Sequence, residues 1–240
     1  MTIDPNNSAI LSQFAKYLIT QKDNPESIPS LTELSKQLNL SVSSLREQLE
    51  VARALGLVDV KPRLGIRKLP YKFSPAVRLS LTFGMATDIS LFNNYADLRK
   101  HIEETYWYEA VTKLTEEDKS YLKVLVEKAI AKLNGTPIQI PHIEHRELHL
   151  TIYNRLYNEF VMGLLEVYWD AYESIGLNVY TDLEYLEEVW DYHKRMVEAI
   201  CNEEYERGYD LLQKHTDLLY NRANKSNEGN LHLPDDRKQE

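Results

Sequence analysis

The sequence predicts a mainly α protein in which an N-terminal winged helix-turn-helix precedes an all-helical bundle. The first 70 residues follow the order helix, turn, helix and hairpin. From about Ser90 to Arg222, apolar residues recur at helical spacing and no strand pattern is convincing. Residues 1–70 hold nine Lys and Arg against seven Asp and Glu, net +2, while the remainder holds 19 against 30, net −11. This contrast indicates two separate roles and permits the first part to face a polyanion.

Local signals support each N-terminal element in turn. Apolar spacing predicts a first helix over 8–20, and Ser30 with Glu33 forms a capping box that predicts a second. Ser41 is placed to cap a third helix over 42–55, which Gly56 ends. Two short strands are expected around a turn at 62–65. In such a motif the helix over 42–55 would be the recognition helix, with its N-terminal end toward the base edges.

The rest of the chain divides into three parts. Residues 71–88 are predicted to be a linker running into a first helix, and 89–223 a bundle of about six helices. Residues 224–240 are polar and are predicted to be a disordered tail. The helical stretches of the bundle are 90–114, 115–135, 142–158, 159–176, 182–201 and 202–222.

Bulk features indicate a cytoplasmic protein without a membrane span. The most apolar stretch, 160–169, is too short to cross a bilayer and contains Glu166. The N-terminus, MTIDPNNSAI, lacks the basic and apolar regions of a signal peptide. Cys201 is the single cysteine, which excludes an internal disulfide and suits a reducing compartment.

The stretch EHRELHL, residues 144–150, places two histidines four residues apart. On a helix, His145 and His149 project from one face, a spacing that suits two ligands of one metal ion but also an ordinary polar helix side. The zinc-protease motif requires Glu directly after the first histidine. Arg146 stands there, and Glu147 would lie on another face, so the protease interpretation fails.

Two downstream histidines favour the metal interpretation. His193 and His215 each border an apolar stripe, although in one straight helix they would lie roughly 33 Å apart at 1.5 Å per residue. A break at 201–204, with Asn202 as the N-cap of the following helix, would produce two antiparallel helices and bring both imidazoles to one level. Three or four inward histidines would form a nitrogen-rich site suited to Zn²⁺ or Ni²⁺.

These segments together resemble the GntR transcription regulators, specifically the FadR-like branch with an FCD-type helical domain. Residues 34–69 resemble its recognition helix, "GLV" exit and glycine-tipped wing. LRKHIE at 98–103 resembles an Arg-x-x-Leu-Glu helix, and 145–158 an Asp-x-x-Phe-His helix that ends in Asn. Residues 192–215 resemble a Glu-His…His segment with the same 22-residue interval. The resemblance covers nearly all of 8–222.

The resemblance implies a divalent metal ion, Zn or Ni, in the helical domain. The implied ligands are His145, His149, His193 and His215. The family usually has Asp at the first of these positions. Imidazole in place of carboxylate raises the charge of the site by one and favours borderline, softer metals.

The resemblance also implies a small carboxylate effector beside the metal. Arg99 falls where the family's arginine points into the effector cavity, and Asn158 where its asparagine lines the same pocket. Arg99 could equally pair with Glu103 along one helix, because the two are four residues apart.

The DNA-binding surface is expected on the recognition helix and the wing. Arg46 is the strongest candidate for a contact with guanine or backbone, whereas Ser41 is as well explained as a helix cap. The family often has Arg where this chain has Val42, so the operator should differ from the usual one. The candidate DNA-binding residues are Ser41, Ser43, Ser44, Arg46, Arg63, Gly65 and Arg67.

The function implied is a ligand-responsive transcription regulator, a repressor, that binds a pseudo-palindromic double-stranded operator as a homodimer and is not an enzyme. The alternative is a helical metal-dependent hydrolase that uses the histidine cluster. Its weak point is the general base, for which Glu144 is a loose candidate. A third possibility is a helical bundle without metal, in which hydrogen bonds satisfy the four histidines.

Overall fold

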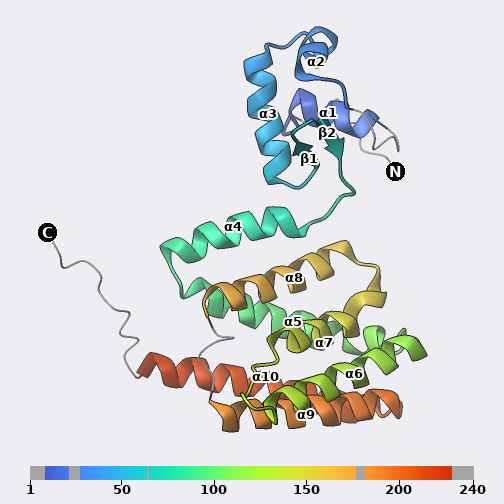
Figure 1. The fold of residues 1–240 in the computed structure, drawn as a ribbon, viewed down its shortest axis with the longest axis vertical. Coiled ribbons are helices and arrows are strands. Elements are labelled where there is room, and N and C mark those ends of the chain that lie inside the picture. The colour runs from blue at the N-terminus through green and yellow to red at the C-terminus, as the bar shows by residue number, and fades with distance from the viewer. Residues whose placement is uncertain (1–8, 22–27, 64, 177–181, 229–240) are drawn as a thin grey trace, which may run out of the picture. The chain divides into compact units, whose positions relative to one another are not determined.

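A computed structural model describes residues 9–21, 28–63, 65–176 and 182–228, with side chains as far as Leu218. The chain divides into two compact units, Met1–Phe83 and Gly84–Glu240 (Figure 1). The described part of the first unit contains three helices, a hairpin and most of a fourth helix, Ser74–Thr87, and the second unit is helical. This confirms the predicted fold class of a winged helix-turn-helix followed by an all-helical bundle.

The first unit has the element order of a winged helix. β1 and β2 pair antiparallel, with Val60 opposite Ile66, and Ile28 adds an isolated bridge to Ile66. Figure 1 shows α1, α2 and the hairpin on the same side of α3. The elements are α1 (Gln13–Thr20), α2 (Leu31–Leu38), α3 (Val42–Ala54), β1 (Val58–Lys61) and β2 (Gly65–Lys68). The core is formed by Phe14, Leu18, Ile28, Leu34, Leu45, Leu49, Ala52, Val58 and Ile66.

The predicted caps are present. The Ser30 hydroxyl accepts the Glu33 N–H, and the Ser30 N–H donates to Glu33 Oε2 at 2.9 Å, which completes the capping box. The Ser41 hydroxyl accepts the Ser44 N–H at 3.1 Å at the start of α3. Gly56 follows α3 with a positive φ of 68°, where a Cβ would lie 2.5 Å from Pro75 Cγ. Both the backbone conformation and the close approach therefore require glycine there.

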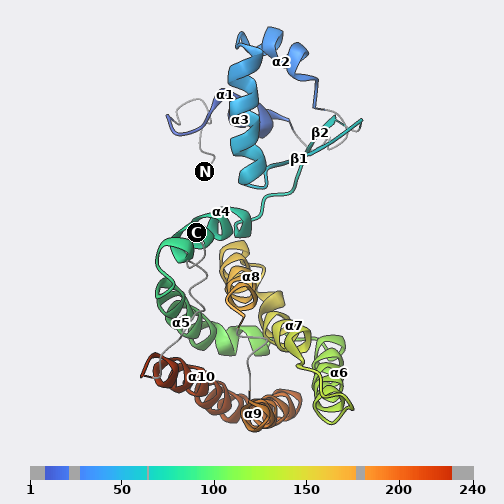
Figure 2. The same ribbon diagram turned by 60° about the vertical axis from the view of Figure 1, so that its left-hand side comes forward.

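The second unit is a bundle that agrees with the predicted stretches. α9 and α10 lie side by side in both views, and α6 packs against α7 and α9 (Figures 1 and 2). The helices from 74 onward are α4 (Ser74–Thr87), α5 (Leu91–Val111), α6 (Glu116–Leu133), α7 (His142–Tyr153), the 3-10 turn η2 (Asn154–Leu156), α8 (Glu159–Ser174), α9 (Leu183–Cys201) and α10 (Tyr205–Glu228). Within the described residues, no helix is both long and apolar enough to cross a membrane.

Several boundaries differ from expectation. α1 begins at Gln13, where Ser12 is the N-cap, and not at residue 8. α7 ends at Tyr153 and is followed by the 3-10 turn, although a helical stretch to 158 was expected. α10 continues to Glu228, into the segment 224–240 that was expected to be a disordered tail, and 229–240 lie outside the described residues. The break after Cys201 is present, but Asn202 is the C-cap of α9 and not the N-cap of α10. The chain reverses at Glu203, which has a φ of 61°, and the Glu204 carbonyl accepts the first backbone bond of α10. Asn202 thus lies two residues too early to cap α10.

The start of α10 is fixed against α5 by a tryptophan. The Trp107 ring is fully buried, and its Nε1–H donates to the Tyr205 carbonyl at 2.9 Å. Gly208 lies against this ring so closely that a Cβ would come 2.7 Å from Trp107 Cζ2. The absence of a side chain at this position lets α10 approach α5.

Gly208→Ala should destabilise the protein by about 1–3 kcal/mol despite the higher helix propensity of alanine, because the rigid buried ring has to move. Gly84→Ala is the matched control, since its Cβ would meet only the end of the flexible Leu91 side chain, at 3.0 Å. Urea denaturation of both variants measures the two effects. A Gly208→Ala variant as stable as Gly84→Ala would contradict this packing.

Candidate metal centre

Four buried histidines meet in the interior of the bundle. They come from three helices: His145 and His149 from α7, His193 from α9 and His215 from α10. Their exposed fractions are 8% for His145 and 0% for the other three. Each offers one nitrogen such that all four nitrogens lie within 4.8 Å of one another. The structure thus brings together all four of the residues predicted as metal ligands.

The sequence pattern explains this convergence. On α7, His145 and His149 lie one turn apart and share the buried side of the helix with Leu148 and Ile152. The chain reversal at 201–204 sets α10 against α9, so the rings of His193 and His215 lie 4.2 Å apart, centroid to centroid. The predicted antiparallel return is therefore confirmed, although a different residue forms the turn.

The nitrogen spacing fits a shared metal ion. His149 Nε2 lies 3.1 Å from His193 Nε2. Two imidazole nitrogens bound to one ion at about 2.0–2.1 Å would lie about 2.8–3.4 Å apart, for right-angled to tetrahedral coordination. Among the described residues, His145 Nε2 and both nitrogens of His215 are buried without a hydrogen-bond partner. Each such atom costs about 1–3 kcal/mol if it stays unsatisfied. A divalent transition-metal ion would use several of these lone pairs at once.

Burial keeps the four imidazoles neutral. Desolvation is the largest cause that lowers the pKa of each, and it takes His145, His193 and His215 well below the ordinary value of 6.5. Charge repulsion within the cluster and from Arg99 acts in the same direction. For His149, the pKa is lowered by burial and partly restored by Glu103. Neutral rings have free lone pairs, as a metal ligand requires.

A buried ion pair on α5 borders the cluster. Arg99 Nη2 lies 3.0 Å from Glu103 Oε2, which is the i,i+4 pair that the sequence allowed. Glu103 Oε1 lies 3.1 Å from His149 Nδ1, and Arg99 Nη2 lies 2.9 Å from the same nitrogen. Sequence reasoning missed this role of Glu103. The available signal was the stripe Arg99, Glu103 and Trp107, in which the charged residues share the side of the helix with a buried tryptophan.

Aromatic rings enclose the group. Trp169 lies 4.6 Å from the His145 ring, and Trp190 lies 4.9 Å from that of His193, centroid to centroid. The Arg99 guanidinium carbon lies 4.4 Å from the centre of the Tyr168 ring and 4.9 Å from that of Trp169. Arg99 Nε and Trp169 Nε1 are buried without an acceptor in the described structure. These two donors would suit an anion, and the sequence had not indicated Trp169.

Asn158, the second residue expected in the effector pocket, lies at the start of α8. Its side-chain oxygen accepts the N–H groups of Phe160 and Val161 at 3.1 and 3.2 Å, which makes it the N-cap of α8. No described contact joins it to Arg99 or to the histidines. The structure thus assigns Asn158 a capping role, and its place in an effector pocket stays a prediction.

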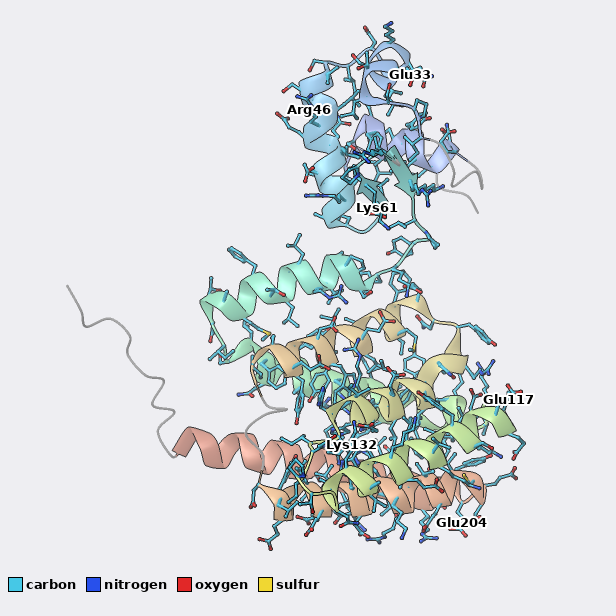
Figure 3. The ribbon with its side chains drawn as sticks, viewed as in Figure 1. Glu33, Arg46, Lys61, Glu117, Lys132 and Glu204 are labelled. Atoms are coloured by element: carbon cyan, nitrogen blue, oxygen red, sulfur yellow. The ribbon has the colours of Figure 1, made fainter. Side chains whose placement is uncertain are left out.

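The hydrolase hypothesis needs a general base beside the four histidines. In the described contacts, neither carboxylate of EHRELHL contacts these histidines. Glu144, the loose candidate of the hydrolase hypothesis, pairs at 2.7 Å with Lys132, which is labelled on α6 in Figure 3. The negative charge of Glu147, together with burial, raises the pKa of Tyr121, which is also on α6. Both acidic residues of the motif thus interact with α6. The described carboxylate at the cluster is Glu103, which already faces Arg99 and His149.

The DNA-binding candidates lie on α3 and the hairpin of the first unit. Arg46 is exposed on the side of α3 away from α1 and α2 (Figure 3). Ser43, Arg63, Gly65 and Arg67 are exposed too. The other two serines have local roles: Ser41 caps α3, and the Ser44 hydroxyl accepts from Gln48 Nε2 at 3.2 Å.

The neutral histidines predict that the metal-free protein loses stability in mild acid. The unfolded chain takes up protons below about pH 6.5 that the folded state does not bind, so the free energy of unfolding falls as pH drops from 7 to 5. The slope is at most about 1.4 kcal/mol per pH unit for each histidine.

Urea denaturation in chelator at several pH values measures this slope, which should be shallower for His215→Leu than for the wild type. Equal slopes in His215→Leu and wild type would contradict the assignment.

Comparison with known proteins identifies the helical unit. The FCD domain model matches residues 95–218, which is more than half of the chain. That match contains the four histidines and Arg99. A search of curated proteins finds no match.

Solved structures are similar across both units. Streptococcus agalactiae GntR is similar with a TM-score of 0.62 and 18% sequence identity, over 85% of this chain and 93% of that one. Escherichia coli McbR/YncC is similar at 20% identity, over 86% of this chain and 90% of that one, with a TM-score of 0.48. At these identities the similarity to the first structure establishes the fold. The chain therefore belongs to the FCD-domain family, and its winged unit and helical unit together have the GntR fold.

Proposed function

We propose that this chain is a ligand-responsive transcription regulator, acting as a repressor, whose FCD unit binds a divalent metal ion and a small carboxylate effector. The observation that carries the proposal is the joining of a winged helix-turn-helix to an FCD unit with a buried four-histidine group. The first part has the elements needed to bind DNA. The second has nitrogen ligands and buried donors suited to a metal and an anion.

Operator recognition is assigned to the N-terminal end of α3 and to the hairpin. Arg46 is exposed and has the reach and donor geometry for guanine or phosphate. Arg63 and Arg67 on the hairpin add positive charge, while Gly65, with a φ of 77°, permits the turn between the strands. Ser41 and Ser43 can donate to phosphates, since a hydroxyl that accepts a capping bond still has its own hydrogen to donate.

A homodimer on a pseudo-palindromic operator follows from the charge of the winged unit. Residues 1–70 carry a net charge of only +2, and each phosphate contact adds a limited amount to affinity. Two winged units on two half-sites would double the contacts and give the operator two-fold symmetry.

The metal ligands in this proposal are His145, His149, His193 and His215. An all-imidazole set suits Zn²⁺ or Ni²⁺ better than the hard cations that prefer oxygen. When bound, the ion would supply a positive charge and a position for an anionic ligand. The protein would not neutralise that charge, because the four rings are neutral and the Glu103 carboxylate faces the Arg99 guanidinium. An anionic effector is therefore favoured.

The effector carboxylate is assigned to the donors beside the histidines. Arg99 Nε and Trp169 Nε1 are the buried donors that would gain an acceptor. Asn158 would support effector binding indirectly. It caps α8, and α8 carries Tyr168 and Trp169 beside Arg99. The effector would change operator affinity through its different affinity for the two arrangements of the winged units.

A gel-shift assay on DNA selected from random sequence tests this function. We expect sequence-selective binding, and Arg46→Ala should weaken it by about 1–3 kcal/mol, or roughly 5- to 150-fold. Arg53→Ala is the matched control, because Arg53 lies at the other end of the same helix and pairs with Glu50. Lack of any sequence-selective binding at low salt would refute the regulator, and equal losses in both variants would refute the role of Arg46.

A further inference from the structure

Two side chains of α5 face one nitrogen of α7. His149 Nδ1 lies 2.9 Å from Arg99 Nη2 and 3.1 Å from Glu103 Oε1. A guanidinium can only donate a hydrogen bond, and an ionised carboxylate can only accept one. A neutral imidazole has one N–H, so Nδ1 can serve Arg99 as an acceptor or Glu103 as a donor, but not both at once.

The use of the other ring nitrogen, Nε2, determines whether Arg99 or Glu103 is the partner of Nδ1. His149 Nε2 lies 3.1 Å from His193 Nε2. With the proton on Nε2, His149 donates to His193, and Nδ1 accepts from Arg99. With Nε2 used as a metal ligand, the proton must be on Nδ1, where it is donated to Glu103, as ligating histidines commonly do to a nearby carboxylate. Arg99 then has no acceptor on this ring.

We propose that Arg99 and Glu103 link metal binding to effector binding. Arg99 is the hydrogen-bond partner of His149 Nδ1 without metal, and Glu103 is its partner with metal. This inference rests on the proposed metal site. In the exchange, an N–H bond is lost at Nε2 and one is formed at Nδ1, so the ring stays neutral and gains no net proton. Glu103 is a positioning residue for His149, and Arg99 holds the ring in its metal-free state.

As a consequence, Arg99 becomes available to bind an anion when the His149 Nδ1–H donates its hydrogen bond to Glu103. Arg99 is 4% exposed and its guanidinium lies over Tyr168 and Trp169, so bulk water cannot replace the lost acceptor. A carboxylate beside the histidines would provide that acceptor. Metal and effector should therefore bind cooperatively, and each should raise the affinity for the other by the same factor.

Nitrogen-15 NMR of histidine-labelled full-length protein tests the exchange, with Zn²⁺ as the probe and His149→Asn to assign the signals. We expect His149 to carry its proton on Nε2 in chelator and on Nδ1 with zinc. A proton on Nδ1 in both states would overturn the exchange while leaving the metal site standing. Failure to take up zinc would overturn the proposed metal function and this inference together.

Two substitutions give a second, directional test by competition with a zinc indicator. Glu103→Gln removes the charge that favours Nδ1–H and should lower zinc affinity about 10- to 100-fold. Arg99→Met removes the competitor and should raise it about fivefold, the equivalent of one hydrogen bond. Arg155→Lys, which alters the Arg155–Asp118 pair on other elements, should leave zinc affinity unchanged. Changes of the same sign at Glu103 and Arg99 would contradict the coupling, and the wild-type NMR result decides if Arg99→Met does not fold.

Discussion

The burial of four uncharged imidazoles at one point is the interaction on which the helical unit depends. Desolvation lowers the pKa of all four, so the core contains neutral rings with lone pairs directed at one another. Buried lone pairs that have no partner lower the stability of such a core. The close spacing of the nitrogens, within 4.8 Å, allows a single divalent ion to provide them.

The helices around the cluster hold this arrangement in place. Trp107 and Gly208 fix α10 against α5, and the reversal at 201–204 brings His215 next to His193. α5 also carries Arg99 and Glu103, the charged pair that touches His149. One helix thus connects the packing of the bundle with the chemistry of the site. A ligand that changes the partners of Arg99 would act on the element that positions α10.

Sequence patterns predicted the features that depend on local spacing. The capping box at Ser30, the i,i+4 pair His145 and His149, and the break after Cys201 all follow from a few neighbouring residues. Features that depend on tertiary approach were missed. Asn202 terminates α9 because the chain reverses at Glu203, and the contact of Glu103 with His149 joins two helices that are distant in sequence. The indole of Trp169 looked like ordinary core, and only its position beside His145 and Arg99 gives its N–H a possible role.

X-ray absorption spectroscopy of the protein loaded with one equivalent of Zn²⁺ tests the central claim most directly. The four-histidine site predicts a first shell of nitrogen or oxygen atoms at about 2.0–2.1 Å, with outer-shell scattering from three or four imidazole rings. His149→Ala should remove one imidazole contribution. A first shell without imidazole scattering, a sulfur ligand from Cys201, or failure to retain zinc would contradict the account.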